Sequence, residues 1–268
     1  MEEWIDLTDE IVDWLRKYAQ KNNISTFVVG VSGGIDSAVT STLCAKTKLD
    51  TIVVNMPIHQ ENSQLELSDR HIEWLLSDWK NVRIRKIDLS EVFDLFTNEE
   101  VIGEGLSDLV LANTRARLRM AALYSVAGSN NGIVVGTGNK IEDFGIGFFT
   151  KYGDGGVDIS PIADLYKSDV YAIADSLGII REIRDAPPTD GLWDDGRTDE
   201  DQIGATYLEL EWAMKENERG FVEDLTDRQK EVMDIFLKLK DTNSHKMSPI
   251  PVFSKSESRT SNNDEYAP

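Results

Sequence analysis

The sequence Val-Gly-Val-Ser-Gly-Gly-Ile-Asp-Ser occupies residues 29–37 and separates an extended pattern from a helical one. Residues 26–29, which precede it, are β-branched and aromatic and predict a buried strand. Apolar residues at helical spacing follow over 37–45 and predict a helix. Gly33 and Gly34 therefore lie in a strand-to-helix turn, where the absence of a Cβ lets the backbone approach a ligand closely.

This turn has the features of a phosphate-binding loop. Ser32, Ser37 and the first amides of the helix supply donors where the helix dipole favours an anion. The loop lacks the lysine of the G-x-x-x-x-G-K-[ST] motif, and it does not match G-x-G-x-x-G. Asp36 would repel a phosphate unless a cation lay between them, which indicates a magnesium-bound polyphosphate. The alternative is a tight turn with a helix-capping serine.

The composition is typical of a globular protein with an acidic surface. The 268 residues carry a net charge of −20, which argues against general nucleic-acid binding because that binding needs a positive field. No apolar run approaches the roughly 18 residues of a membrane span, and the acidic N-terminus is unlike a secretory signal. A single cysteine, Cys44, permits no intramolecular disulfide framework. We therefore predict a cytoplasmic protein with neither membrane nor nucleic-acid partners.

Strands and helices alternate through the first half of the chain. The predicted elements are strands at 26–31, 51–55, 82–87 and 132–136, and helices at 8–21, 36–46, 61–77, 90–96 and 107–127. This alternation predicts an α/β fold with a parallel sheet flanked by helices on both faces. Ligands of such sheets bind beyond the carboxyl ends of the strands. Both the glycine-rich turn and the sequence Gly-Thr-Gly-Asn at 136–139 would lie there.

The second half of the chain is less regular. Residues 138–161 interleave glycines with aromatic residues, which suggests a loop around a ligand, with a flexible surface loop as the alternative. Residues 187–204 read as an exposed, mobile segment. Residues 1–253 are expected to form one domain, followed by a polar, flexible tail at 254–268. Further helices are predicted at 165–177, 204–216 and 226–241.

Candidate residues for a magnesium-polyphosphate site follow two of the predicted strands, at the carboxyl edge of the sheet. Asp36 is the first candidate metal ligand and Glu142 the second, although Glu142 could also be a solvated first-turn acid. Arg115 and Arg119 share a helix face opposite Arg117, so the three cannot all serve one site. No Ser/His/Asp or Cys/His arrangement is evident, which disfavours an activated side-chain nucleophile. The candidate phosphate partners are Arg115, Arg117, Arg119, Lys140, Lys151 and Lys167.

At residues 32–37 the chain resembles the S-G-G-x-D-S loop of the ATP pyrophosphatases, which have an adenine nucleotide alpha hydrolase-like, Rossmann-like fold. Later stretches resemble the ammonia-dependent NAD synthetases, and the most specific of them is Phe-Thr-Lys-Tyr-Gly-Asp-Gly-Gly-Val-Asp at 149–158. Residues 143–147 are one residue longer than the family pattern. The other matching stretches are 136–139, 161–167, 188–189 and 244–246.

The resemblance implies a role for each matching residue. Magnesium would be held by Asp36 and Glu142, and catalysis would depend on Asp36, Lys151 and Lys167. The residues implied in ATP binding are Gly30, Val31, Ser32, Gly33, Gly34, Ile35, Asp36, Ser37, Thr137, Lys167 and Thr189. The residues implied in deamido-NAD binding are Arg117, Lys151, Asp158, His245 and Lys246. The choice of Arg117 over Arg115 follows from register alone.

The implied reaction is the amidation of deamido-NAD. Its nicotinate carboxylate attacks the α-phosphate of ATP, pyrophosphate leaves, and ammonia displaces AMP from the acyl adenylate to give NAD. A closing loop would protect the adenylate from water, and 187–204 is the candidate. A homodimer is also implied, with candidate interfaces on the helices at 107–127 and 8–21. The alternatives are a GMP-forming or tRNA-thiolating ligase of the same superfamily and a non-catalytic nucleotide-binding regulator.

Overall fold

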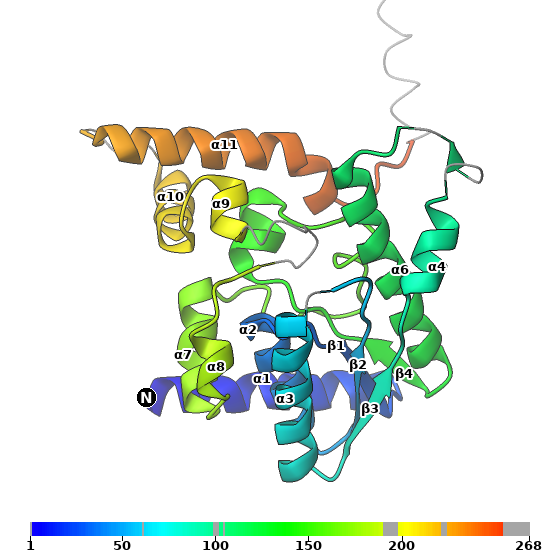
Figure 1. Ribbon diagram of the computed structural model, residues 1–268. Helices are drawn as coiled ribbons and strands as arrows, with labels where there is room; N and C mark the ends of the chain where they lie inside the picture. Colours follow the sequence, from blue (N-terminus) through cyan, green and yellow to red (C-terminus); the bar gives the residue numbers. More distant parts are fainter. Residues whose placement is uncertain are drawn as a thin grey trace, which may run out of the picture.

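A four-stranded parallel sheet forms the centre of the computed structural model (Figure 1). The structure describes residues 2–60, 62–98, 102–103, 105–189, 198–220 and 224–253. The strands are β1 (Thr26–Gly30), β2 (Asp50–Asn55), β3 (Val82–Lys86) and β4 (Gly132–Val134), in the order β3-β2-β1-β4. All three neighbouring pairs are parallel, so the predicted strands and their common direction are confirmed. The glycine-rich turn leaves β1 in the middle of the sheet.

Helices cover both faces of the sheet because alternate side chains of each strand point in opposite directions. Phe27 and Val29 of β1 pack in a cluster with α1 (Glu2–Lys21), α2 (Ile35–Lys46) and α7 (Lys167–Ser176). Val53 of β2, on that same face, packs against α3 (Asn62–Asp78). Val28 faces the opposite way, toward α4 (Ser90–Phe96) and α6 (Asp108–Gly128). The α/β fold predicted from the alternation is confirmed.

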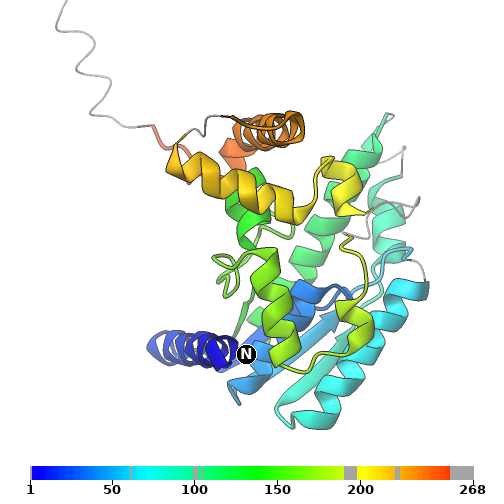
Figure 2. The same ribbon diagram turned by 90° about the vertical axis from the view of Figure 1, so that its left-hand side faces the viewer.

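Three C-terminal helices lie beyond the carboxyl ends of the strands: α9 (Asp199–Ile203), α10 (Tyr207–Arg219) and α11 (Asp227–Met247). The short helix α8 (Arg181–Arg184) packs instead beside α2 and α7. Helices α10 and α11 pack with the short helix η1 (Ile141–Ile146) in a second apolar cluster. Figure 2 shows α10 and α11 above α7 and α8. None of the described helices is both long and apolar enough to cross a bilayer.

Three predicted segments differ from the structure. Helix α1 begins at Glu2, six residues before the predicted start at residue 8, because Trp4 and Leu7 continue its apolar stripe. Residues 138–161 contain the helix η1 and are therefore not a loop throughout. The segment 187–204 ends in α9, where Asp199 and Ile203 are buried, so this part is not exposed as predicted. Residues 190–197 and the predicted tail 254–268 lie outside the described residues.

The helix η1 is a π-helix, and it overlaps residues 143–147, which the resemblance predicts to be one residue longer than the family pattern. A π-helical turn holds more residues than an α-helical turn, so it can absorb an insertion without displacing its ends. Phe144 on this turn is 53% exposed, whereas Ile141 and Ile146 are fully buried. Gly147 ends the helix with φ +63°, and its backbone N–H donates to the Glu142 carbonyl. The π-helical turn therefore presents Phe144 to solvent and packs Ile141 and Ile146 in the core.

His71 of α3 is buried against α2, and its burial should make the stability of the fold sensitive to acid. Its Nε2 lies 2.9 Å from the Ser41 hydroxyl, and burial lowers the pKa of His71 to about 4. In the unfolded chain His71 is therefore protonated below about pH 6.5, whereas in the folded chain it is protonated only below about pH 4. This linkage should remove about 2 kcal/mol of unfolding free energy between pH 7 and pH 4.5.

Urea denaturation at the two pH values measures this loss. Between pH 7 and pH 4.5, the unfolding free energy of His71→Asn should fall by about 2 kcal/mol less than that of the wild type. His59→Asn is the matched control, because His59 is exposed and the variant keeps His71. An equal acid loss in wild type and His71→Asn would contradict the prediction.

Candidate active site

A cavity of about 280 Å³ opens at the carboxyl end of the sheet, beside the glycine-rich turn. Residues 30–37 form one wall, and α6 forms another through side chains that include Arg119 and Met120. Thr137, Glu142 and Lys167 also line it, together with 186–189 and Asp199. Every residue that the resemblance assigned to ATP or magnesium therefore lies on this one cavity.

The glycine-rich turn is held in shape by its own hydroxyl groups. Ser37 Oγ donates to the Gly34 carbonyl at 2.9 Å and accepts from the Ser32 amide at 3.2 Å. Ser32 Oγ accepts from the Gly34 amide at 3.2 Å. Gly33 has φ +93°, a conformation that strains residues with a Cβ. The turn leads directly to the N-terminus of α2, where the helix dipole favours an anion.

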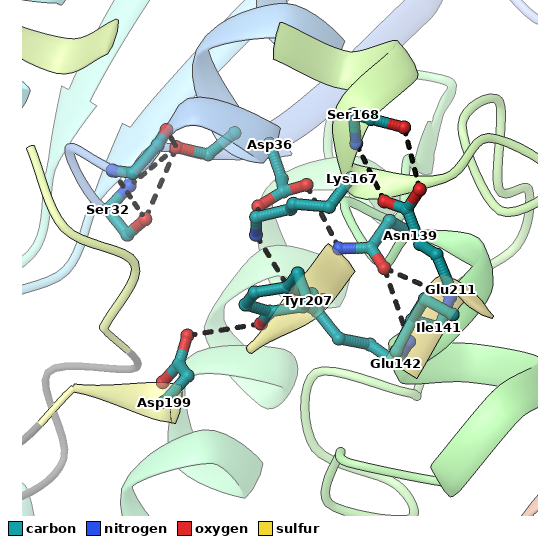
Figure 3. A network of polar contacts seen from close by, with 12 residues as sticks. Ser32, Asp36, Asn139, Ile141, Glu142, Lys167, Ser168, Asp199, Tyr207 and Glu211 are labelled. Atoms are coloured by element: carbon teal, nitrogen blue, oxygen red, sulfur yellow. Dashed lines mark hydrogen bonds and ion pairs between the residues drawn. The ribbon is translucent and has the colours of Figure 1, made fainter. Parts of the chain in front are cut away.

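Asp36, Glu142 and Lys167 line the cavity and form a buried ion triad (Figure 3). Lys167 Nζ is 2.5 Å from Asp36 Oδ2 and 3.2 Å from Glu142 Oε1. Asn139 Nδ2 donates to Asp36 Oδ1 at 3.2 Å. Burial alone would lower the pKa of Lys167, but the carboxylates of Asp36 and Glu142 raise it overall. The residues come from α2, the turn after β4, η1 and α7, so the tertiary fold alone brings them together.

The two carboxylates have the chemistry of a partial magnesium site. Burial raises the pKa of Asp36, and nearby Glu142 raises it further while Lys167 opposes the rise. A divalent cation would favour both ionised carboxylates. No group of three or more potential metal ligands occurs in the described part of the chain. Magnesium commonly binds through one or two carboxylates and takes its other ligands from phosphates and water, so the pair fits that ion.

A second group of cations lies next to the cavity. Arg117 Nε donates to the Lys151 carbonyl at 3.3 Å, and Lys151 Nζ donates to the His245 carbonyl at 2.7 Å. Lys246 Nζ donates to the carbonyls of Gly147 and Phe149. Four of the five residues assigned to deamido-NAD are thus neighbours. None of the four is among the described residues that line the cavity.

Asp158, the fifth of these residues, lies apart from the other four. Its carboxylate accepts from the Val134 amide at 2.7 Å and from the Tyr124 hydroxyl at 3.0 Å. These bonds tie the strand-like segment after 156 to β4 and α6. The role of Asp158 in acceptor binding stays a prediction.

The other candidate cations have different surroundings. Arg119 lines the cavity, and its Nε donates to the Met56 carbonyl at 3.0 Å. The guanidinium of Arg115 lies 4.5 Å from the centre of the Phe93 ring, on the other side of α6 from Lys151. Lys140 pairs with Asp164 at 3.0 Å on the surface. Arg119 is therefore the arginine of α6 that faces the cavity.

Sequence reasoning missed several polar residues around the triad. Tyr207 donates its hydroxyl hydrogen to Glu142 Oε1 at 2.6 Å, and Asp199 lies 3.4 Å from the same hydroxyl. Burial raises the pKa of Asp154, which lines the cavity, to about 6 and that of Asp143 to about 7. The Gly-Asp-Gly-Gly sequence was a signal for Asp154. Tyr207 carried no such signal, because 65 residues separate it from its partner.

Comparison with known proteins agrees with this geometry. The model of the NAD synthase family matches residues 7–250. This chain belongs to that family. A curated relative, the NH(3)-dependent NAD(+) synthetase of Methanosarcina mazei, is 35% identical over 250 residues, which cover 91% of this chain and 96% of the relative.

Solved structures of the NAD synthase family support the same assignment. The NMN synthetase of Francisella tularensis is 30% identical, with a TM-score of 0.81 over 94% of this chain and 98% of that one. The NH3-dependent NAD synthetase of Campylobacter jejuni is 25% identical, with a TM-score of 0.76 over 94% and 99% of the two chains. The expected Rossmann-like fold of the family is confirmed.

Proposed function

We propose that this chain is a ligase that amidates deamido-NAD with ammonia at the expense of ATP, yielding NAD, AMP and pyrophosphate. The observation that carries the proposal is the triad of Asp36, Lys167 and Glu142 in the cavity formed by the glycine-rich turn. The described lining contains neither histidine nor cysteine, and burial raises the pKa of Cys44, so no activated side-chain nucleophile is evident. Attack by the substrate's own carboxylate needs none.

The proposed roles follow from charge and position. The Ser32–Ser37 turn would bind the phosphates of ATP, while Lys167 would neutralise charge that develops as pyrophosphate leaves. Asp36 and Glu142 would hold magnesium, which neutralises further phosphate charge. The neighbouring cations would hold the acceptor through its phosphates, in line with ATP. The remaining ATP contacts would be Thr137 and Thr189.

Nicotinate mononucleotide is a second candidate acceptor. The solved structure with a TM-score of 0.81 is an NMN synthetase. Amidation of a nicotinate carboxylate gives NMN from that mononucleotide in the same way as it gives NAD from deamido-NAD. The two acceptors differ only in the adenylate half, so one assay can compare them.

The test is a coupled assay for the pyridine nucleotide and AMP, with ATP, magnesium, ammonium and either acceptor. We expect ammonium-dependent NAD and a loss of at least a hundredfold in Asp36→Ala and Lys151→Ala. Lys17→Ala, on the exposed face of α1, should keep wild-type activity. Normal ATP binding without formation of the amide product would contradict the proposed reaction.

We also propose a homodimer, because α4 and α6 expose neighbouring apolar side chains. Leu95 is 69% exposed and Leu109 is 59% exposed, a large apolar surface for a monomer to leave in water. Helix α1 exposes Ile5 and Trp14 and is the alternative interface. Sedimentation at micromolar concentration measures the state directly, and a monomer there would contradict the proposal. The cytoplasmic location and the single domain over 1–253 stay predictions.

A further inference from the structure

We infer that one face of α10 positions the ion triad, through Tyr207 on Glu142 and through Glu211 on the first turn of α7, which carries Lys167. The inference rests on the proposed function, because it assigns the triad to Mg·ATP. It adds two positioning residues, neither of which touches ATP or the reacting atoms.

Tyr207 controls where the Glu142 carboxylate lies. Its hydroxyl donates to Glu142 Oε1 at 2.6 Å, and Lys167 Nζ donates to the same oxygen at 3.2 Å. Within the described chain both hydrogen bonds to this carboxylate thus use one oxygen, which leaves Oε2 available to a cation. Tyr207 is 4% exposed, and its ring lies 4.5 Å from Lys167 Nζ. Without the Tyr207 hydroxyl, Lys167 would be the remaining described donor to Glu142, and the Glu142 carboxylate would move closer to the Lys167 ammonium.

Glu211 controls where α7 begins. Its two carboxylate oxygens accept from the Ser168 amide at 2.9 Å and from the Ser168 hydroxyl at 2.8 Å. Glu211 is only 4% exposed, and such a buried carboxylate is tolerated because it satisfies donors at the positive end of a helix. Lys167 is the first residue of α7 and precedes Ser168 directly. The contact therefore fixes the backbone from which the triad lysine projects.

The two positioning residues share a rigid support. Tyr207 and Glu211 are four residues apart, so they lie one turn from each other on the same face of α10. The helix begins with a capping box, in which the side chains of Thr206 and Glu209 cap each other's backbone amide. Glu209 also pairs with Arg228 of α11 through two hydrogen bonds, at 2.8 and 2.9 Å. A side chain held by such an anchored helix keeps its geometry before the ligand arrives.

The test measures ATP affinity calorimetrically with magnesium and with EDTA. In the wild type, the ratio of the two dissociation constants is the gain from magnesium. Tyr207→Phe should cut this gain about tenfold, the worth of a hydrogen bond to a charged group, and leave the EDTA affinity unchanged. Glu211→Gln should instead weaken ATP binding in EDTA about tenfold, because Lys167 is displaced, and keep the gain from magnesium. Tyr18→Phe on α1 is the matched control and should change neither.

A double-mutant cycle separates positioning from a purely structural role. If Tyr207 acts through Glu142, Tyr207→Phe should have no further effect on the magnesium gain in a Glu142→Ala background. The inference is overturned if the tenfold loss persists there, or if Tyr207→Phe lowers only the melting temperature. Because deamido-NAD is absent from this experiment, its outcome is independent of whether the proposed amidation is correct.

Discussion

Replacing Lys167 with Met should abolish activity and destabilise the free protein. We expect kcat to fall about a thousandfold, because the change removes the cation placed beside the phosphate-binding turn. The unfolding free energy should fall by about 3 kcal/mol, because Asp36 and Glu142 then face each other without a counter-charge. Both carboxylates are largely shielded from water, with side-chain exposures of 17% and 16%.

The pH dependence of this variant identifies the cause of its instability. Burial already raises the pKa of Asp36, and the loss of Lys167 removes the opposing effect. Protonation of one carboxylate relieves the repulsion, so the stability deficit should shrink as the pH falls from 8 to 5. Urea denaturation of wild type and variant across this range measures it.

The matched control is Lys230→Met, which removes a lysine that is 61% exposed and pairs with the exposed Asp227 at 3.4 Å. An exposed pair of this kind contributes about 0.5 kcal/mol, so this variant should stay close to wild type. A deficit in Lys167→Met that is independent of pH would indicate lost packing and would contradict the electrostatic account.

The sheet could be predicted from sequence because each of its strands carries a local signal. Residues 26–29 are continuously apolar or β-branched, as a strand buried on both faces requires. The position of the cavity followed from the same pattern, since parallel strands end at one edge. Glu142 was a candidate because it follows the Gly-Thr-Gly-Asn sequence after the fourth strand, whereas Thr137 was assigned through the family resemblance.

The contacts around the triad could not be predicted from local patterns. Tyr207 reads as an ordinary apolar position of an amphipathic helix, and its hydroxyl finds Glu142 only after α10 packs on η1. Asp199 stands in an acidic run, which is typical of exposed chain, yet it is 6% exposed. The capping box of Thr198 and Asp201 was a local signal for α9 that the acidic run obscured.

Gly147→Ala should destabilise the fold by about 3 kcal/mol and weaken acceptor binding. Gly147 has φ +63°, and a Cβ there would lie 2.5 Å from Cβ of Asn243 on α11. The left-handed conformation costs about 1 kcal/mol for alanine, and overpacking adds about 2 kcal/mol. Asn243 also donates to the Ile146 carbonyl at 2.8 Å, so relief of the clash must move α11 away from η1.

This movement would separate the proposed acceptor cations. Lys246 donates to the Gly147 carbonyl, and Lys151 reaches the His245 carbonyl at the end of α11. The KM for deamido-NAD should therefore rise more than the KM for ATP. Gly178→Ala is the matched control, because Gly178 has φ +69° but no heavy atom within 4 Å of the added Cβ. Gly178→Ala should lower the unfolding free energy by about 1 kcal/mol, the cost of the left-handed conformation alone, which is about a third of the loss in Gly147→Ala. Equal losses in urea denaturation would mean that α11 accommodates the methyl group, and the contact between η1 and α11 would then not maintain the acceptor side of the site.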